Sequence, residues 1–307
     1  MIRLQDSLLL VVSYSGIVAG VLFPRLGAPF QGIPLYCMMA LLFLSFLSVP
    51  LGDMVETLHH EKGRVSYLLL LKLIVLPGVV FVVFHRIAPG YALAALLLSA
   101  ASTGVIAPFF AGILPADIPL VVVMLVASSL LMPLTLPVLV QGLMGRTVEM
   151  PFLPMVEMLC AVVFIPFALA EALKRSATGA MERLVRWRFG ISLFLFGITN
   201  LAIFSKYASH VLQAPATLVN AFVVAVLLAA LYLAIALVAS WKMPLPQQLS
   251  VMICCSIMNN ILILVFSSRF FGARESAVAA MYTVPFFLMI VPLRLYQRWR
   301  LASTGAR

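Results

Sequence analysis

Two polar interruptions in long apolar segments are the parts of this chain best suited to binding a solute. Ser102-Thr103-Gly104, followed by Pro108, interrupts one segment, and Asn259-Asn260 interrupts another. Proline removes a helix hydrogen bond and glycine weakens the helix further, so the freed backbone groups must be satisfied by neighbours, water or a ligand. Paired breaks of this kind in two halves of a membrane chain are typical of the solute site of a secondary transporter.

The second break follows two further candidate residues, Cys255 and Ser256. We expect Cys255 to share a helix face with Asn259, and Ser256 to share one with Asn260. Hydrogen bonding between packed helices is the alternative role for the asparagines, and a simple proline kink is the alternative at Pro108. The candidate substrate or ion site comprises Lys72, Ser102, Thr103, Gly104, Pro108, Cys255, Ser256, Asn259 and Asn260.

Lys72 is the ionisable residue placed deepest in an apolar segment, within the run from Leu68 to Pro77. A lysine at mid-helix costs on the order of 3 kcal/mol on insertion scales. We therefore expect Lys72 to face the protein interior and to find a partner there. The alternative, a side chain that reaches the membrane interface, is opposed by its depth. A buried amine can also be neutral, which would let Lys72 exchange a proton.

The elements that position these residues follow from the composition. Of the 307 residues, 64% are hydrophobic and 10% are charged, whereas a soluble domain has about 25% charged residues. The chain is therefore expected to be an all-α integral membrane protein, one unit over 1–307. The expected ten transmembrane helices are 7–24, 33–51, 65–85, 91–114, 117–143, 153–173, 188–206, 216–241, 247–271 and 276–296.

The ten spans divide into five and five, 1–144 and 145–300. An odd number of spans per half places the two halves in opposite orientations, which predicts an inverted repeat. Most Lys and Arg residues, including those of 174–188 and the C-terminal tail, fall on the side of the N-terminus. That bias predicts cytoplasmic termini in a multi-pass protein of the inner (plasma) membrane. The net charge of +10 is attributed to lipid headgroups and not to nucleic acid.

The sequence offers little for catalysis or for a metal. It contains no hydrolase elbow, P-loop or zinc motif, so no enzyme activity is expected. The four cysteines lie in apolar segments without CxxC spacing, and His59 and His60 have no nearby partner for a metal site. Ser128 and Ser129, midway along the fifth segment, are interpreted as helix-packing residues.

At this point the chain resembles the bile acid:sodium symporter family, in its bacterial branch. The resemblance rests on the ten-span plan and on these segments: Leu47-Ser48-Val49-Pro50-Leu51 with Asp53, Leu71 to Pro77, Ser102 to Pro108, Pro133 to Pro137, and Met258-Asn259-Asn260. It implies a panel and a core domain, two broken helices (the fourth and ninth) that cross in the core, transport of organic anions, and two sodium ions behind the crossing.

The resemblance also indicates where this chain departs from the family. The family's Ser-Asn pair falls on Ala107-Pro108, and its fifth-span hydroxyl ligands fall near Val121 and Leu125. Its ninth-span acidic ligand falls on Cys255, and the Gln that follows falls on Asn259. Its third-span Gln falls on Lys72. The sodium sites are therefore expected to be degenerate, with no cofactor bound.

The resulting hypothesis is a carrier of small organic anions, bile-acid-like or carboxylate, that works by alternating access. Lys72 replaces the coupling ion, so transport is sodium-independent or coupled to protons. Two alternatives remain. One is another ten-helix carrier, for arsenite or of the auxin-efflux kind, and the other is a non-transporting binding or sensory membrane protein. The oligomeric state stays open.

Overall fold

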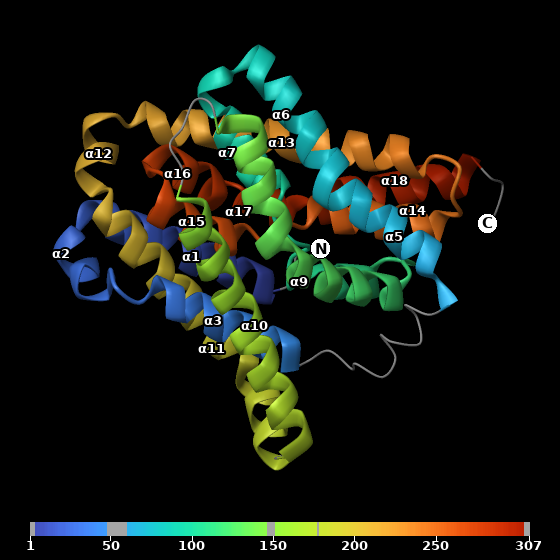
Figure 1. Cartoon of the computed structure of the whole chain (residues 1–307), viewed down its shortest axis with the longest axis horizontal. Coiled ribbons are helices and arrows are strands. Elements are labelled where there is room, and N and C mark those ends of the chain that lie inside the picture. Colours follow the sequence, from blue (N-terminus) through green and yellow to red (C-terminus); the bar gives the residue numbers. More distant parts are fainter. Residues whose placement is uncertain (1–3, 48–59, 146–150, 177, 304–307) are drawn as a thin grey trace.

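The computed structural model describes residues 4–47, 60–145, 151–176 and 178–303, which are almost entirely helical (Figure 1). The Ser48–Leu51 motif, Asp53 and His59 lie outside these ranges. The helices are α1 (Leu4–Leu22), α2 (Pro24–Gly27), α3 (Pro34–Leu47), α5 (Lys62–Leu70), α6 (Leu76–Ile87), α7 (Ala92–Ser99), α8 (Ala107–Ile113), α9 (Ile118–Met144), α10 (Phe152–Ser176), α11 (Thr178–Lys206), α12 (Ala208–Gln213), α13 (Ala216–Ser240), α14 (Leu245–Ser256), α15 (Asn260–Phe270), α16 (Ala273–Met281), α17 (Thr283–Leu288) and α18 (Ile290–Ser303).

Six helical stretches in the described residues are long and apolar enough to cross a membrane: Lys62–Ile87, Ile118–Met144, Phe152–Ser176, Arg183–Lys206, Ala216–Ser240 and Ala273–Ser303. A seventh is added if Pro24–Phe30 and Pro34–Leu47, which are bent by 68°, form one span. The expected count of ten is therefore not confirmed. Two of the expected spans, 91–114 and 247–271, consist of short helices on either side of a break, and neither part alone reaches the ~20 residues that a span needs.

One group of helices consists of α1, α3, α10 and α11, which pack on one another (Figure 1). Gly16 and Gly20 of α1 bring its backbone against α11. A Cβ atom at Gly16 would lie 2.7 Å from the carbonyl oxygen of Gly197, and one at Gly20 would lie 2.7 Å from that of Leu201. Glycines four residues apart commonly allow such close helix packing in membranes.

The second group consists of α5 to α9 and α13 to α18, and it contains both breaks. Leu71–Val75 joins α5 to α6 as one turn of π-helix (η2). Helices α7 and α14 lead into the two breaks. Helices α9 and α13 pack on both α7 and α14, and α16 packs on α7. The two groups meet where α9 packs on α10 and where α15 packs on α3 and α11.

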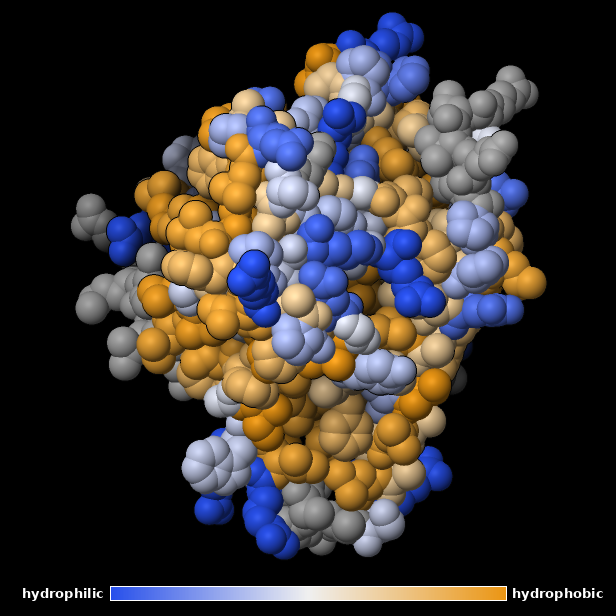
Figure 2. All heavy atoms as spheres, turned by 90° about the vertical axis from the view of Figure 1, so that its left-hand side faces the viewer, coloured by the Kyte–Doolittle hydropathy of each residue, from blue (hydrophilic) through white to orange (hydrophobic). Residues whose placement is uncertain are grey.

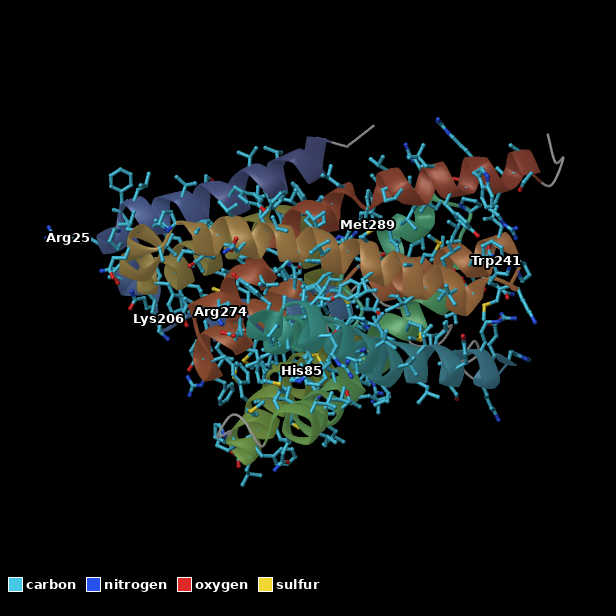
Figure 3. All side chains as sticks on the ribbon, turned by 90° about the horizontal axis from the view of Figure 1, so that it is seen from above. Arg25, His85, Lys206, Trp241, Arg274 and Met289 are labelled. Carbon is cyan, nitrogen blue, oxygen red and sulfur yellow. The ribbon has the colours of Figure 1, made fainter. Side chains whose placement is uncertain are left out.

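Residue types that favour the membrane–water interface mark opposite ends of the molecule. Arg25, Lys206 and Arg274 lie toward one end, and Trp241 lies at the other (Figure 3). Figure 2 looks directly at the end that carries Arg25, Lys206 and Arg274. Hydrophilic residues gather near the centre of this face, and hydrophobic surface lies to their left and below them. This distribution is typical of a membrane protein whose ends meet water and whose sides meet lipid.

Candidate functional site

The two breaks contact each other through their backbones. The fourth segment is unwound between Ser99, where α7 ends, and Ala107, where α8 begins, and the ninth is unwound at 257–259. The amide of Gly104 donates to the carbonyl of Ile257 (2.6 Å), and the amide of Asn259 donates to the carbonyl of Ser102 (3.0 Å). Thr103 and Met258 thereby form an isolated antiparallel bridge. Each break thus satisfies backbone groups that the other leaves free.

Gly104 lets the two unwound segments come this close. A Cβ atom at this position would lie 2.8 Å from the carbonyl oxygen of Met258 and 3.1 Å from that of Ile257. Backbone atoms cannot give way as the end of a flexible side chain can. The glycine is therefore required by the approach of the second segment and not only by the break in its own helix.

Thr103 is held on both sides by neighbouring helices. Its amide donates to the hydroxyl oxygen of Ser128 in α9 (3.0 Å), and its own hydroxyl donates to the carbonyl of Cys254 in α14 (3.3 Å). At the other break the hydroxyl of Tyr282 donates to the carbonyl of Ser256 (2.7 Å). These bonds satisfy backbone groups at helix ends that have no partner within their own helix.

Lys72 reaches the contact between the two breaks from the π-turn of the third segment. Its side chain is fully buried (0% exposed), as its position in an apolar run predicts. Its amine donates to the carbonyl of Ser99 (3.4 Å), the last residue of α7, and to the sulfur of Met258. The thiols of Cys255 and Cys254, in the last turn of α14, interact electrostatically with this amine. Two ion pairs are found among the described side chains, Arg64 with Glu61 and Lys174 with Glu171, and Lys72 belongs to neither.

Two polar side chains at the bridge have donors without partners. The hydroxyl of Ser102 and the amide nitrogen of Asn259 are buried and make no hydrogen bond among the described residues. The side-chain oxygen of Asn259 caps α15 by accepting from the amide of Leu262 (3.4 Å). The side-chain nitrogen of the same residue is the atom left without a partner. A buried donor without a partner costs ~1–3 kcal/mol. At the meeting point of the two breaks, these two donors are free to bind a water molecule or a ligand.

The remaining predicted residues have other partners or positions. Asn260 donates to the carbonyl of Ala279 (3.2 Å) and to the hydroxyl of Thr283 (2.9 Å), which is the interhelical bonding role. Ser256 donates within its own helix to the carbonyl of Met252. Pro108 is half-buried in the first turn of α8. The structure thus has a true break at the fourth segment in place of a kink in a continuous helix.

The expected face-sharing of Cys255 with Asn259, and of Ser256 with Asn260, is wrong. Helix α14 ends at Ser256 and α15 begins at Asn260, so the spacing of four residues no longer places side chains on one face. Cys255 is buried in the last turn of α14, near Lys72.

Sequence reasoning missed several contacts of the site. Ser128 is more than the packing residue that its position predicts, because its hydroxyl accepts a hydrogen bond from the amide of Thr103. Ser129 donates only to the carbonyl of Leu125 in its own helix. Ser99, Met258 and Tyr282 also belong to the site. The signal for Ser128 was its place as a hydroxyl in the middle of a long apolar span. The backbone carbonyl of Ser99, which accepts from Lys72, has no such signal in the sequence because every residue has a backbone carbonyl.

Within the described part of the chain, no group of His, Cys, Asp and Glu side chains is arranged to hold a metal ion. Comparison with curated proteins finds no significant match. Comparison with family models matches residues 35–214, more than half of the 307, to the sodium bile acid symporter family. The matched part contains Lys72, the first break and Ser128. The chain belongs to the sodium bile acid symporter family, whose members are membrane transporters and not enzymes.

Proposed function

We propose that this protein is a secondary carrier of small organic anions, of the bile-acid or carboxylate kind, that works by alternating access. The observation that carries the proposal is the pair of unpartnered buried donors, the Ser102 hydroxyl and the Asn259 amide, at the bridge between the breaks. An anionic oxygen is the ligand that such donors prefer, because hydrogen bonds to charged groups are the strong ones.

The end of α15 supports an anionic substrate. Asn259 stands at the N-terminus of this 11-residue helix, which carries a partial positive charge. The free amide nitrogen of Asn259 and the free hydroxyl of Ser102 lie beside that end, since the two residues are joined by their backbones. A carboxylate or sulfate placed there would gain both the helix-end field and two donors.

The movement that we propose is of one helix group against the other, in a ten-span inverted repeat. Helices α1, α3, α10 and α11 correspond to the panel, and the group that contains the breaks corresponds to the core. The contact between the groups that supports this view is at Ser268, in the last turns of α15. Its carbonyl accepts from the amine of Lys206 (3.0 Å) and from the hydroxyl of Tyr207 (3.1 Å), at the end of α11. Opening at this end would require both bonds to break.

We further propose that Lys72 takes the place of the coupling ion. Sodium needs hard oxygen ligands, but the corresponding positions hold the thiol of Cys255 and the amine of Lys72, and the apolar side chains of Val121 and Leu125. This donor set does not fit sodium. A charged Lys72 would instead neutralise the carbonyl end of α7, where its amine already contacts Ser99. If the amine loses its proton during the cycle, transport would be coupled to protons.

The topology that we propose places both termini in the cytoplasm of a bacterial cell, with the protein in the inner membrane. The support for this is the distribution of Lys and Arg residues over the segment ends.

The experiment that tests the function is uptake by the purified protein in proteoliposomes, with taurocholate and a small monocarboxylate as probes. We expect uptake of at least one probe at equal rates in sodium and in potassium media. In parallel, sodium should give no rise in melting temperature over potassium at equal ionic strength, since only a ligand that binds the folded state raises it. A sodium-specific rise would contradict the Lys72 proposal. Absence of uptake for both probes in both media would contradict the carrier function.

A further inference from the structure

An apolar groove on the outer surface separates α5 and α6 from α13. It has a volume of about 480 Å³ and is lined by Tyr67, Leu70, Leu71, Val75 and Val79 on one side and by Ala234, Ile235, Val238 and Ala239 on the other. Several of these side chains are strongly exposed, with Val238 at 78% and Leu70 at 56%. In a membrane these surfaces meet lipid chains.

The length of the groove matches one leaflet. The twelve residue steps from Tyr67 to Val79 rise ~18 Å at 1.5 Å per residue, and half of the ~30 Å hydrocarbon core is ~15 Å. At its end the hydroxyl of Tyr67 donates to the carbonyl of Ala239 (2.8 Å), which ties α5 to α13 there. An acyl chain lying along the groove would thus run from the headgroup level to about the middle of the bilayer.

The end of the groove beyond Tyr67 is basic. Lys62 begins α5, and Trp241 and Lys242 directly follow α13. Figure 3 shows Trp241 at the same end of the molecule as the start of α5. Both lysines are exposed and neither takes part in an ion pair among the described residues, whereas nearby Arg64 is paired with Glu61. Tryptophan next to lysine is typical of the headgroup level, where the cations meet phosphates.

We propose that this groove binds one anionic phospholipid, with an acyl chain along α6 and α13 and its headgroup between Lys62 and Lys242. A neutral lipid would fill the apolar part but would leave the two cations without a counter-charge. A dimer formed through the same face is disfavoured, because an isologous contact pairs each patch with itself and would bring the basic ends of the two copies together. The site is separate from the crossing, so the proposal does not depend on transport.

The test is a titration of the purified protein in detergent with phosphatidylglycerol and, separately, with phosphatidylcholine of the same acyl chains, read by native mass spectrometry. Each lysine near the surface contributes about fivefold in affinity for an anionic lipid. We expect Lys62→Gln with Lys242→Gln to weaken phosphatidylglycerol binding by ~25-fold and to leave phosphatidylcholine binding unchanged. Ala234→Phe, which fills the groove, should weaken binding of both lipids.

The control is Arg25→Gln with Arg86→Gln, which removes two exposed cations away from the basic end of the groove. Arg86 lies in the last turn of α6, at the opposite end of the α5–α6 segment from Lys62, and Arg25 lies in α2. This control should bind phosphatidylglycerol as the original protein does. Thermal unfolding of each variant confirms that it is folded. Equal affinity for the two lipids in the original protein would overturn the proposal. So would an equal loss in the Arg25 and Arg86 variant, or a dimer in detergent that Ala234→Phe disrupts.

Discussion

The amine of Lys72 lies 3.4 Å from the carbonyl oxygen of Ser99, the residue at which α7 ends. This contact joins the π-turn of the third segment to the first break. The carbonyls at the C-terminus of a helix carry a partial negative charge that a nearby cation stabilises. The covalently attached amine of Lys72 therefore meets the end of a half-helix beside the contact between the two breaks.

Replacing Lys72 with methionine tests the role of that ammonium. Methionine has a similar length without the charge, so we expect transport to fall by ~30-fold, the equivalent of about 2 kcal/mol for a favourably placed charge at a helix end. Initial uptake rates in proteoliposomes measure the effect. Lys174→Met, which removes a lysine paired with Glu171 at the end of α10, serves as the control. An unchanged rate in Lys72→Met would remove the basis for an ion substitute.

Gly104→Ala should destabilise the protein by about 1–3 kcal/mol, because the new methyl group would meet the carbonyl of Met258 across the bridge. Thermal unfolding in detergent measures the loss as a lower melting temperature. Gly112→Ala provides a matched control in α8, because nothing lies within 4 Å of a Cβ atom there. In a helix that control should be neutral or stabilising by up to ~1 kcal/mol. Equal melting temperatures for the two variants would show that the close approach at Gly104 is unimportant.

Ser102→Ala separates stability from binding. The hydroxyl has no partner, so its removal should leave the melting temperature unchanged or raise it. Affinity for an anionic substrate should fall by roughly 10-fold or more, the usual value of a hydrogen bond to a charged group. Ser129→Ala is the control, since that hydroxyl bonds only within its own helix and should not affect binding. A large loss of stability in Ser102→Ala, with unchanged affinity, would give the residue a purely structural role.

Loss of the hydrogen bond from Tyr207 to Ser268 should favour conformations in which α15 separates from the end of α11. Tyr207→Phe removes the half-buried hydroxyl that donates to Ser268, and one such bond contributes about 1 kcal/mol, or ~5-fold in a population. Lys206→Met should change this population little, because the amine of Lys206 is exposed to solvent and its hydrogen bond to Ser268 contributes little free energy. Hydrogen exchange of the C-terminal turns of α15 should quicken in Tyr207→Phe. The same measurement on Tyr36→Phe, an exposed tyrosine of α3, should show no change.

Much of the fold could be predicted because apolar composition and helix-breaking residues act locally. Gly104 and Pro108 indicated the first break, which the structure places between Ser99 and Ala107. The burial of Lys72 followed from the cost of a charge in lipid. The span count was less secure, since a broken span has no single helix of sufficient length.

The pairing of the two breaks depends on tertiary geometry, and no local pattern could have given it. Asn259 and Asn260 are adjacent and identical in type, yet one has a free donor at the bridge and the other bonds to Ala279 and Thr283. Their difference arises because α15 begins between them. Ser128 could be recognised only once α9 was known to pass beside Thr103.

The bridge between Ser102–Gly104 and Ile257–Asn259 is made of main-chain atoms alone. Substitution by any residue except proline leaves the donors and acceptors of the bridge in place, provided that position 104 stays free of a side chain. The main-chain atoms that join the two breaks can therefore stay the same while the side chains around them change. The polar side chains presented beside the bridge can differ between related chains while the same main-chain junction holds the two breaks together.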